Sequence, residues 1–69
     1  MKRKFVAERW IPIEERLPEN INNVLICQKD GYVNTGYYSR SCEWLDMNSM
    51  PYKDVIAWMP MPEPYGPLN

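Results

Sequence analysis

The stretch VLICQKDGYVNTGYY, residues 24–38, decides the fold of this chain. Two segments rich in β-branched and aromatic residues flank Asp30-Gly31, and this dipeptide between such segments predicts a β-hairpin. If Asp30-Gly31 forms a two-residue turn, Ile26 pairs with Thr35. In that register one face of the hairpin carries Val24, Ile26, Val33, Thr35 and Tyr37. Gly36 then lies on the other face, where its missing side chain leaves room for a neighbouring ring.

Turn-forming residues beyond this hairpin predict two further strands. Ser39-Arg40-Ser41 is typical of a second turn, and the expected strands span residues 24–29, 32–38, 42–46 and 54–59. Proline follows at positions 60, 62, 64 and 67. Because proline cannot donate a ladder hydrogen bond, the last strand is expected to end at Met59 and to continue as an extended segment.

The N-terminal part of the chain predicts one short helical turn over residues 12–17, since Pro12 suits a first helical position and Pro18 ends a helix. We therefore expect an α+β fold that is mostly β. It is a small antiparallel sheet of three to four strands, with the helical turn before it and a proline-rich extended C-terminal segment after it. Residues 1–9 are expected to form a basic tail or short extended segment, residues 10–64 a single domain and residues 65–69 a C-terminal tail.

Aromatic residues are expected to carry the core. The chain has 69 residues, among them three Trp and five Tyr. A core of this size rarely supplies more than about 3 to 5 kcal/mol of net stability, so large rings must contribute. Trp10 and Trp58 each stand two positions before a proline, near opposite ends of the chain. We expect both to be structural, as lids that fold over the ends of a small sheet.

The composition argues against an enzyme. Histidine is absent, which removes the commonest general base and metal ligand. Cys27 and Cys42 are too few for a zinc site, and we expect them to be buried, reduced thiols. Glu14-Glu15 is the only adjacent acidic pair, and neighbours on a helical turn point apart. We expect no catalytic residue, no metal and no cofactor.

Tyr38, Arg40 and Trp44 are the expected partner-binding residues, because Tyr, Arg and Trp are enriched in interface hot spots. The structural alternative is that Tyr38 packs against Trp44 on a second small face. Eight basic against nine acidic residues leave no overall field that attracts nucleic acid. A further alternative is that residues 64–67, which fit P-x-x-P, form a proline-rich ligand.

Two end motifs carry a resemblance to a known family. WIPIEERLPE at residues 10–19 and WMPMPEP at residues 58–64, with VLI and GY between them, resemble the phage and prophage family called domain of unknown function five hundred and fifty-one. The resemblance spans nearly the whole chain. It implies a small phage-associated protein without an assigned activity. Ala57 stands where the family usually has histidine, so chemistry that depends on that imidazole is absent here.

The expected function follows from these observations together. We expect a phage- or prophage-encoded accessory protein that binds a host or phage protein, with inhibition of a host defence protein as one form of this action. The alternatives are a structural or self-associating accessory protein, which includes a homo-oligomer, and a protein that binds single-stranded nucleic acid. No apolar run reaches the roughly 18 to 20 residues of a membrane span, so we expect no membrane contact and a location in the cytoplasm of the bacterial host.

Overall fold

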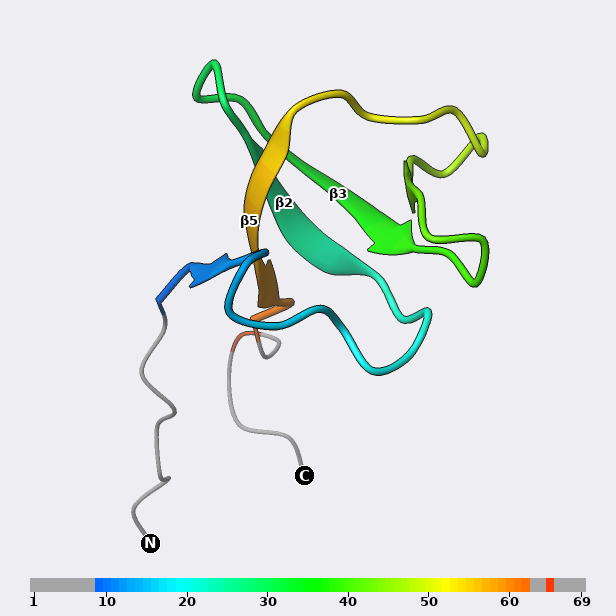
Figure 1. The fold of residues 1–69 in the computed structure, drawn as a ribbon. Coiled ribbons are helices and arrows are strands. Elements are labelled where there is room, and N and C mark those ends of the chain that lie inside the picture. The colour runs from blue at the N-terminus through cyan, green and yellow to red at the C-terminus, as the bar shows by residue number, and fades with distance from the viewer. Residues whose placement is uncertain (1–8, 63–64, 66–69) are drawn as a thin grey trace, which may run out of the picture.

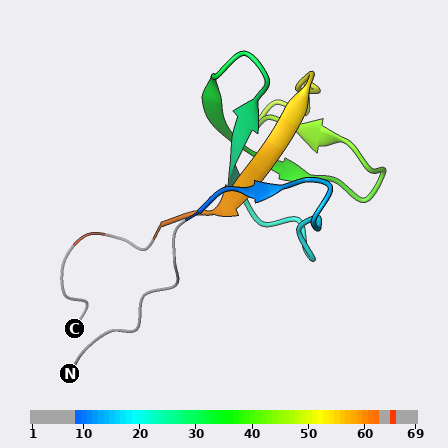
Figure 2. The same ribbon diagram turned by 60° about the vertical axis from the view of Figure 1, so that its left-hand side comes forward.

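Five strands build the fold, and the computed structural model describes residues 9–62 and Tyr65. The strands are β1 (Ile11–Pro12), β2 (Val24–Gln28), β3 (Val33–Tyr38), β4 (Trp44–Leu45) and β5 (Val55–Pro60). They form one sheet in the order β1-β5-β2-β3-β4, and every neighbouring pair is antiparallel (Figure 1). β2, β3 and β4 follow one another as a meander, β5 returns beside β2, and β1 lies along the outer side of β5 (Figure 2).

The structure confirms the mostly β fold and corrects two of its details. The sheet has five strands instead of three to four, because Ile11–Pro12 adds a short strand that pairs with Trp58 and Ala57. The expected helical turn is a hydrogen-bonded turn at residues 13–15, closed by the Glu15 amide on the Pro12 carbonyl at 2.9 Å. A helix confined between Pro12 and Pro18 would be too short to repay its nucleation. The described part of the chain contains no helix that could cross a membrane.

Proline is part of the sheet, contrary to expectation. β5 continues through Pro60, which pairs with Val24, and Pro12 pairs with Ala57. The Ile13 amide donates to the carbonyl of Ile56 on β5, so the backbone of Pro12 faces away from β5. Along β5 the same alternation turns Pro60 away from β2, toward the side of β1. Neither missing N–H therefore removes a ladder bond.

The first hairpin exists, but its predicted register was wrong by one residue. Ile26 pairs with Asn34 instead of Thr35. The loop has three residues, Lys29 to Gly31, because the Gln28 amide bonds the Tyr32 carbonyl at 2.9 Å and the Gly31 amide bonds the Gln28 carbonyl at 2.8 Å. A slip of one residue moves every side chain of β3 to the opposite face. Val33, Thr35 and Tyr37 thus lie on the face opposite to Val24 and Ile26. Gly36 lies on the same face as Val24 and Ile26.

Gly36 is buried on the core face, where the chain crosses it closely. A Cβ atom at this position would lie 2.8 Å from Cδ1 of Ile26 and 2.9 Å from Cε2 of Tyr52, and would also meet the Leu45 carbonyl oxygen. The Tyr52 hydroxyl donates to the Thr35 carbonyl at 2.7 Å, which holds the ring across β3. The expected neighbouring ring is present, although it covers the face opposite to the predicted one.

The core is small and lies on one face of the sheet. Its buried cluster comprises Ile11, Val24, Ile26, Val55 and Trp58, with Ile13, Trp44 and Tyr52 packed against it. Only Ile26 is fully buried among the large side chains of the described residues. Burial of a side chain of this kind stabilises the fold by about 1.5 to 3 kcal/mol. Burial of these few residues therefore exceeds the conformational-entropy cost of folding by only a small margin. Of the expected N-terminal tail, residues 1–9, all but Arg9 lie outside the described residues, as does the P-x-x-P segment apart from the exposed Tyr65.

Candidate binding surfaces

The hairpin between β3 and β4 ends in a tightly defined tip, residues 39–43. The Ser39 amide donates to the Glu43 carbonyl at 2.7 Å, and the Cys42 amide donates to the Ser39 carbonyl at 2.9 Å. This leaves a three-residue loop, Arg40 to Cys42, with Cys42 in the left-handed region at φ 68°. Residues other than glycine adopt that conformation at a cost of roughly 1 to 2 kcal/mol.

Side chains of the tip hold its backbone. The Ser39 hydroxyl oxygen accepts hydrogen bonds from the amides of Ser41 and Glu43, both at 3.2 Å. The hydroxyls of Ser39 and Ser41 are 2.8 Å apart, and the Ser41 hydroxyl donates to the Glu43 carboxylate at 3.3 Å. This network restricts the loop to one conformation and leaves the Arg40 side chain in solvent.

Tyr38 and Trp44 form the base of the tip. They pair across β3 and β4, with ring centroids 4.8 Å apart and planes tilted by 55°. Both rings are half-buried, and Trp44 packs against the core cluster. A hydrogen bond to the Cys42 side chain, with a smaller effect of burial, raises the pKa of Tyr38. The structure thus brings Tyr38 and Trp44 together and places Arg40 beyond them at the exposed end of the same hairpin.

The cysteines are free, but their expected burial was only partly met. Cys27 is half-buried on β2, whereas Cys42 is exposed. Cys42 is exposed because it occupies the loop itself and not the strand that residues 42–46 were expected to form. No cluster of three or more potential metal-ligating residues occurs in the described part of the chain.

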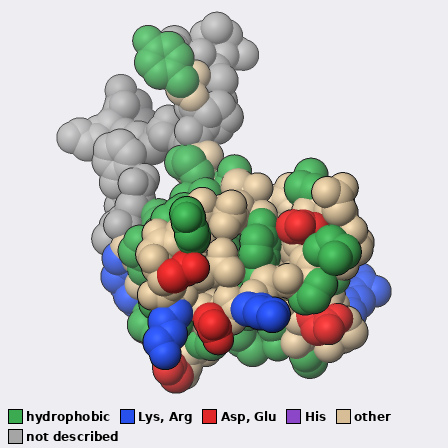
Figure 3. Space-filling model, turned by 90° about the horizontal axis from the view of Figure 1, so that it is seen from above, with side chains coloured by type: hydrophobic (Ala, Val, Ile, Leu, Met, Phe, Trp, Pro, Cys, Tyr) green, Lys and Arg blue, Asp and Glu red, His purple; other side chains and the backbone are tan. Residues whose placement is uncertain are grey.

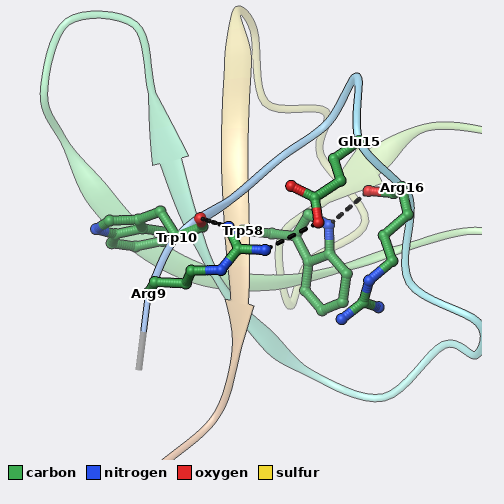
Figure 4. Close-up of polar contacts among 5 residues, drawn as sticks. All are labelled: Arg9, Trp10, Glu15, Arg16 and Trp58. Carbon is green, nitrogen blue, oxygen red and sulfur yellow. Dashed lines mark hydrogen bonds and ion pairs between the residues drawn. The ribbon is translucent and has the colours of Figure 1, made fainter. Parts of the chain in front are cut away.

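Trp58 lies in the core beneath the N-terminal segment (Figure 4). Its indole N–H donates to the Arg16 carbonyl at 3.0 Å, and the Arg16 guanidinium lies 5.3 Å from the ring centroid. Trp10 is half-buried, and it is not part of the core cluster. Arg9 bonds the Trp10 carbonyl at 3.1 Å and the Glu15 carboxylate at 2.9 Å.

The two outermost strands, β1 and β4, offer few free backbone groups to a further strand. At β1, the Arg9 side chain donates a hydrogen bond to the Trp10 carbonyl. Pro12 has no N–H, and its carbonyl accepts a hydrogen bond from the Glu15 amide in the following turn. At β4, the Tyr52 amide donates a hydrogen bond to the Trp44 carbonyl at 2.8 Å, and Leu45 forms an isolated antiparallel β-bridge with Pro51. β1 and β4 therefore offer little for recognition by strand addition, although β4 pairs with β3 only at Tyr37 and Tyr38.

The face of the sheet opposite the core is apolar, and we call it the open face. The pairing register places nine side chains on it: Pro12, Leu25, Cys27, Val33, Thr35, Tyr37, Leu45, Ala57 and Met59. Thr35 is exposed, Val33 is 51% exposed and most of the others are half-buried. The sequence prediction missed this face because the assumed register put Val33, Thr35 and Tyr37 in the core. The signal for it is VLIC at the start of β2, where consecutive residues are apolar.

The remaining surface is mixed in charge. On the face seen from above, acidic and basic side chains lie interspersed with neutral ones (Figure 3). A shallow hollow is lined by Gln28, Lys29, Asp30, Pro51, Tyr52, Lys53 and Asp54. Its two lysines are balanced by two aspartates, so it provides no field that would select an anion.

The comparison with family models settles the relationship of this chain. The model described as Protein of unknown function (DUF551) matches residues 9–65. The chain belongs to this family. The match begins just before β1 and extends past β5, so it covers the whole sheet. Neither the curated proteins nor the solved structures contain a match to the chain.

Proposed function

We propose that this DUF551 protein is a phage- or prophage-encoded accessory protein that binds a host or phage protein in the bacterial cytoplasm, and that the tip around Arg40 is its binding site. Inhibition of a host defence protein is one action that such binding would serve. The observation that carries the proposal is the tip itself: a loop locked by its own hydrogen bonds holds a strained residue, Cys42, and presents an exposed arginine.

Rigidity is the first argument for the tip. A loop that is already ordered loses little conformational entropy on binding, so more of its contact energy appears as affinity. The backbone of Cys42 is held in a conformation that glycine would adopt at lower cost. Strained residues of this kind persist where surrounding contacts determine them, and they concentrate at functional sites.

The second argument is the chemistry that the tip presents. Arg40 offers a planar donor group for carboxylates and backbone carbonyls. The half-buried rings of Tyr38 and Trp44 lie at its base and keep the hairpin in one position. Because Trp44 packs against the core, we assign it to supporting the site and Arg40 to contacting the partner.

The experiment compares Arg40→Ala and Arg40→Glu with Lys53→Ala, which removes another exposed cation outside the tip. Tagged variants are used to capture a partner from host or phage-infected cell lysate, and the partner is then titrated against each purified variant. Arg40→Ala should leave the melting temperature unchanged and weaken binding by about 1 to 3 kcal/mol, the range of a hot-spot truncation. Arg40→Glu should weaken it further, and Lys53→Ala should not.

Undiminished affinity in folded Arg40→Ala and Arg40→Glu variants would move the site away from the tip. Single-stranded nucleic acid remains a weaker proposal, since stacking proteins of that class add a basic groove to their aromatic residues. Titration of a fluorescent oligonucleotide at low salt tests it directly, and tight, salt-sensitive binding would favour it over a protein target.

A further inference from the structure

The open face departs from the usual pattern of a sheet with one solvated side. Antiparallel strands of that kind alternate between apolar residues toward the core and polar residues toward water. Here the outward positions of β2, Leu25 and Cys27, are as apolar as the inward positions Val24 and Ile26. A strand that is apolar on both faces is typical of a sheet covered on both sides.

The core face alone gives the fold little stability. One large side chain is fully buried among the described residues, both cysteines are free, and no metal-ligating cluster is present in that part of the chain. Small domains that lack disulfides and metals are commonly stabilised by association. Because the outer strands β1 and β4 offer few free backbone groups, the open face is the part of the sheet best suited to association.

We propose that two copies of this chain pack open face against open face and form a β-sandwich of two sheets. A two-fold interface brings the same surface patch to itself, so any charge on it would approach its own copy. None of the nine open-face side chains is charged. Homodimer interfaces are more apolar than interfaces with separate partners, and packed sheets lie about 10 Å apart with their side chains interdigitated.

The net charge of the protein is compatible with a second copy on the open face. A formal charge of −1 produces little long-range repulsion between copies. A separate protein partner would usually find charged or hydrogen-bonding groups that fix its orientation, whereas the nine side chains of this face include only the hydroxyls of Thr35 and Tyr37, with Glu43 at its border. The second copy is therefore the partner that the face fits best.

The dimer and the proposed partner site are independent. Tyr38 and Trp44 alternate with Tyr37 and Leu45 along their strands, so they point to the core face and not to the open face. Covering the open face leaves the tip accessible, and a dimer would present two tips. The inference does not rest on the proposed function.

The test uses two adjacent residues of β3 that are both exposed but lie on opposite faces, Thr35 and Asn34. The molar mass of wild type, Thr35→Lys and Asn34→Lys is measured by sedimentation between about 1 μM and 1 mM, which covers weak to moderate affinities. Wild type and Asn34→Lys should form dimers. Thr35→Lys should raise the dimer dissociation constant by roughly a hundredfold or more, because two like charges meet in an apolar interface.

Amide NMR spectra check that each variant is folded. The bond from Tyr52 uses the Thr35 backbone carbonyl, so the side-chain change leaves it in place. If Thr35→Lys fails to fold, Val33→Lys on the open face and Ile21→Lys in the loop before β2 form a second pair, with 51% and 49% exposure. Only Val33→Lys should weaken the dimer.

Three results would overturn the inference: a monomeric wild type up to about 1 mM, a dimer unaffected by open-face lysines, or open-ended assembly into larger species. Arg40→Ala should leave the dimer intact, so loss of partner binding and loss of dimerisation remain distinguishable. A monomer that still binds a partner through the tip would keep the proposed function and remove the dimer.

Discussion

The loop before β3, residues 29–31, and the loop after β3, residues 40–42, have the same backbone pattern but are stabilised differently. In each, the residue before a three-residue loop pairs with the residue after it, and the last loop residue has positive φ: 96° at Gly31 and 68° at Cys42. Glycine adopts this conformation freely, whereas a residue with a Cβ does not. In the second loop the hydroxyl oxygen of Ser39 accepts hydrogen bonds from two backbone amides. In the first loop the equivalent side chain, Gln28, donates instead to the Lys53 carbonyl, outside the loop.

A third loop after β4 repeats the second arrangement. The Asp46 amide bonds the Met50 carbonyl at 2.9 Å, the Ser49 amide bonds the Asp46 carbonyl at 2.9 Å, and Ser49 has φ 65°. The Asp46 carboxylate accepts from the amides of Asn48 at 2.7 Å and Met50 at 2.9 Å. The loop with glycine at its last position has a polar side chain only within it, where Asp30 accepts from the Tyr32 amide at 3.2 Å. The two loops without glycine each have a short polar side chain before them that accepts from two amides.

Removing that polar side chain should have the largest effect. Asp46→Ala deletes two hydrogen bonds to a charged acceptor and leaves Ser49 in its strained conformation, so it should lower the free energy of unfolding by about 2 kcal/mol. Asp46→Asn keeps an acceptor oxygen and should restore most of the loss. Urea denaturation of the two variants measures the difference. Equal stability of Asp46→Ala and wild type would contradict the role of the carboxylate.

Removing glycine from the first loop should have a smaller effect. Gly31→Ala introduces a Cβ at φ 96°, where nothing lies within 4 Å to clash with it. The cost is therefore that of the backbone conformation alone, about 1 kcal/mol. Gly31→Asn should cost less, since asparagine tolerates this region better. Thermal unfolding of both variants measures the two losses of stability. If Gly31→Asn loses as much stability as Gly31→Ala, the positive φ at residue 31 is not the cause.

Adding glycine to the second loop should have the smallest effect, and in the opposite direction. Cys42→Gly removes the strain but increases the entropy of the unfolded chain, so we expect a gain of about 0.5 to 1 kcal/mol. Cys42→Ser removes the thiol without relieving the strain and serves as the control. If Cys42→Gly is no more stable than Cys42→Ser in denaturant titrations, the left-handed residue carries no measurable strain.

This comparison also explains what could be predicted from the sequence. Asp30-Gly31 correctly indicated a hairpin, but the same dipeptide fits a two-residue turn or the end of a three-residue loop. Choosing the shorter turn shifted the register by one residue and hid the open face. The strand Ile11–Pro12 was missed because two residues with a proline carry no periodicity, and only pairing with β5 makes them a strand.

The candidate site was predicted in part. The sequence indicated that Tyr38 and Trp44 lie near each other across a hairpin and that Arg40 lies at its turn. It did not indicate that Cys42 belongs to the loop, because a cysteine gives no signal for positive φ. The position of Trp44 against the core also depends on Gly36 and Tyr52, which meet only in the folded chain.

The bond from the Trp58 indole to the Arg16 carbonyl joins residues 42 positions apart. Hairpins close short loops, while pairing of β1 with β5 must first close nearly the whole chain, which costs more entropy. The order of events in folding follows from this: the meander can form early, and docking of the N-terminal segment over Trp58 completes the structure. The indole N–H gains its acceptor only in that last step, so a change in Trp58 fluorescence would report the slowest part of folding.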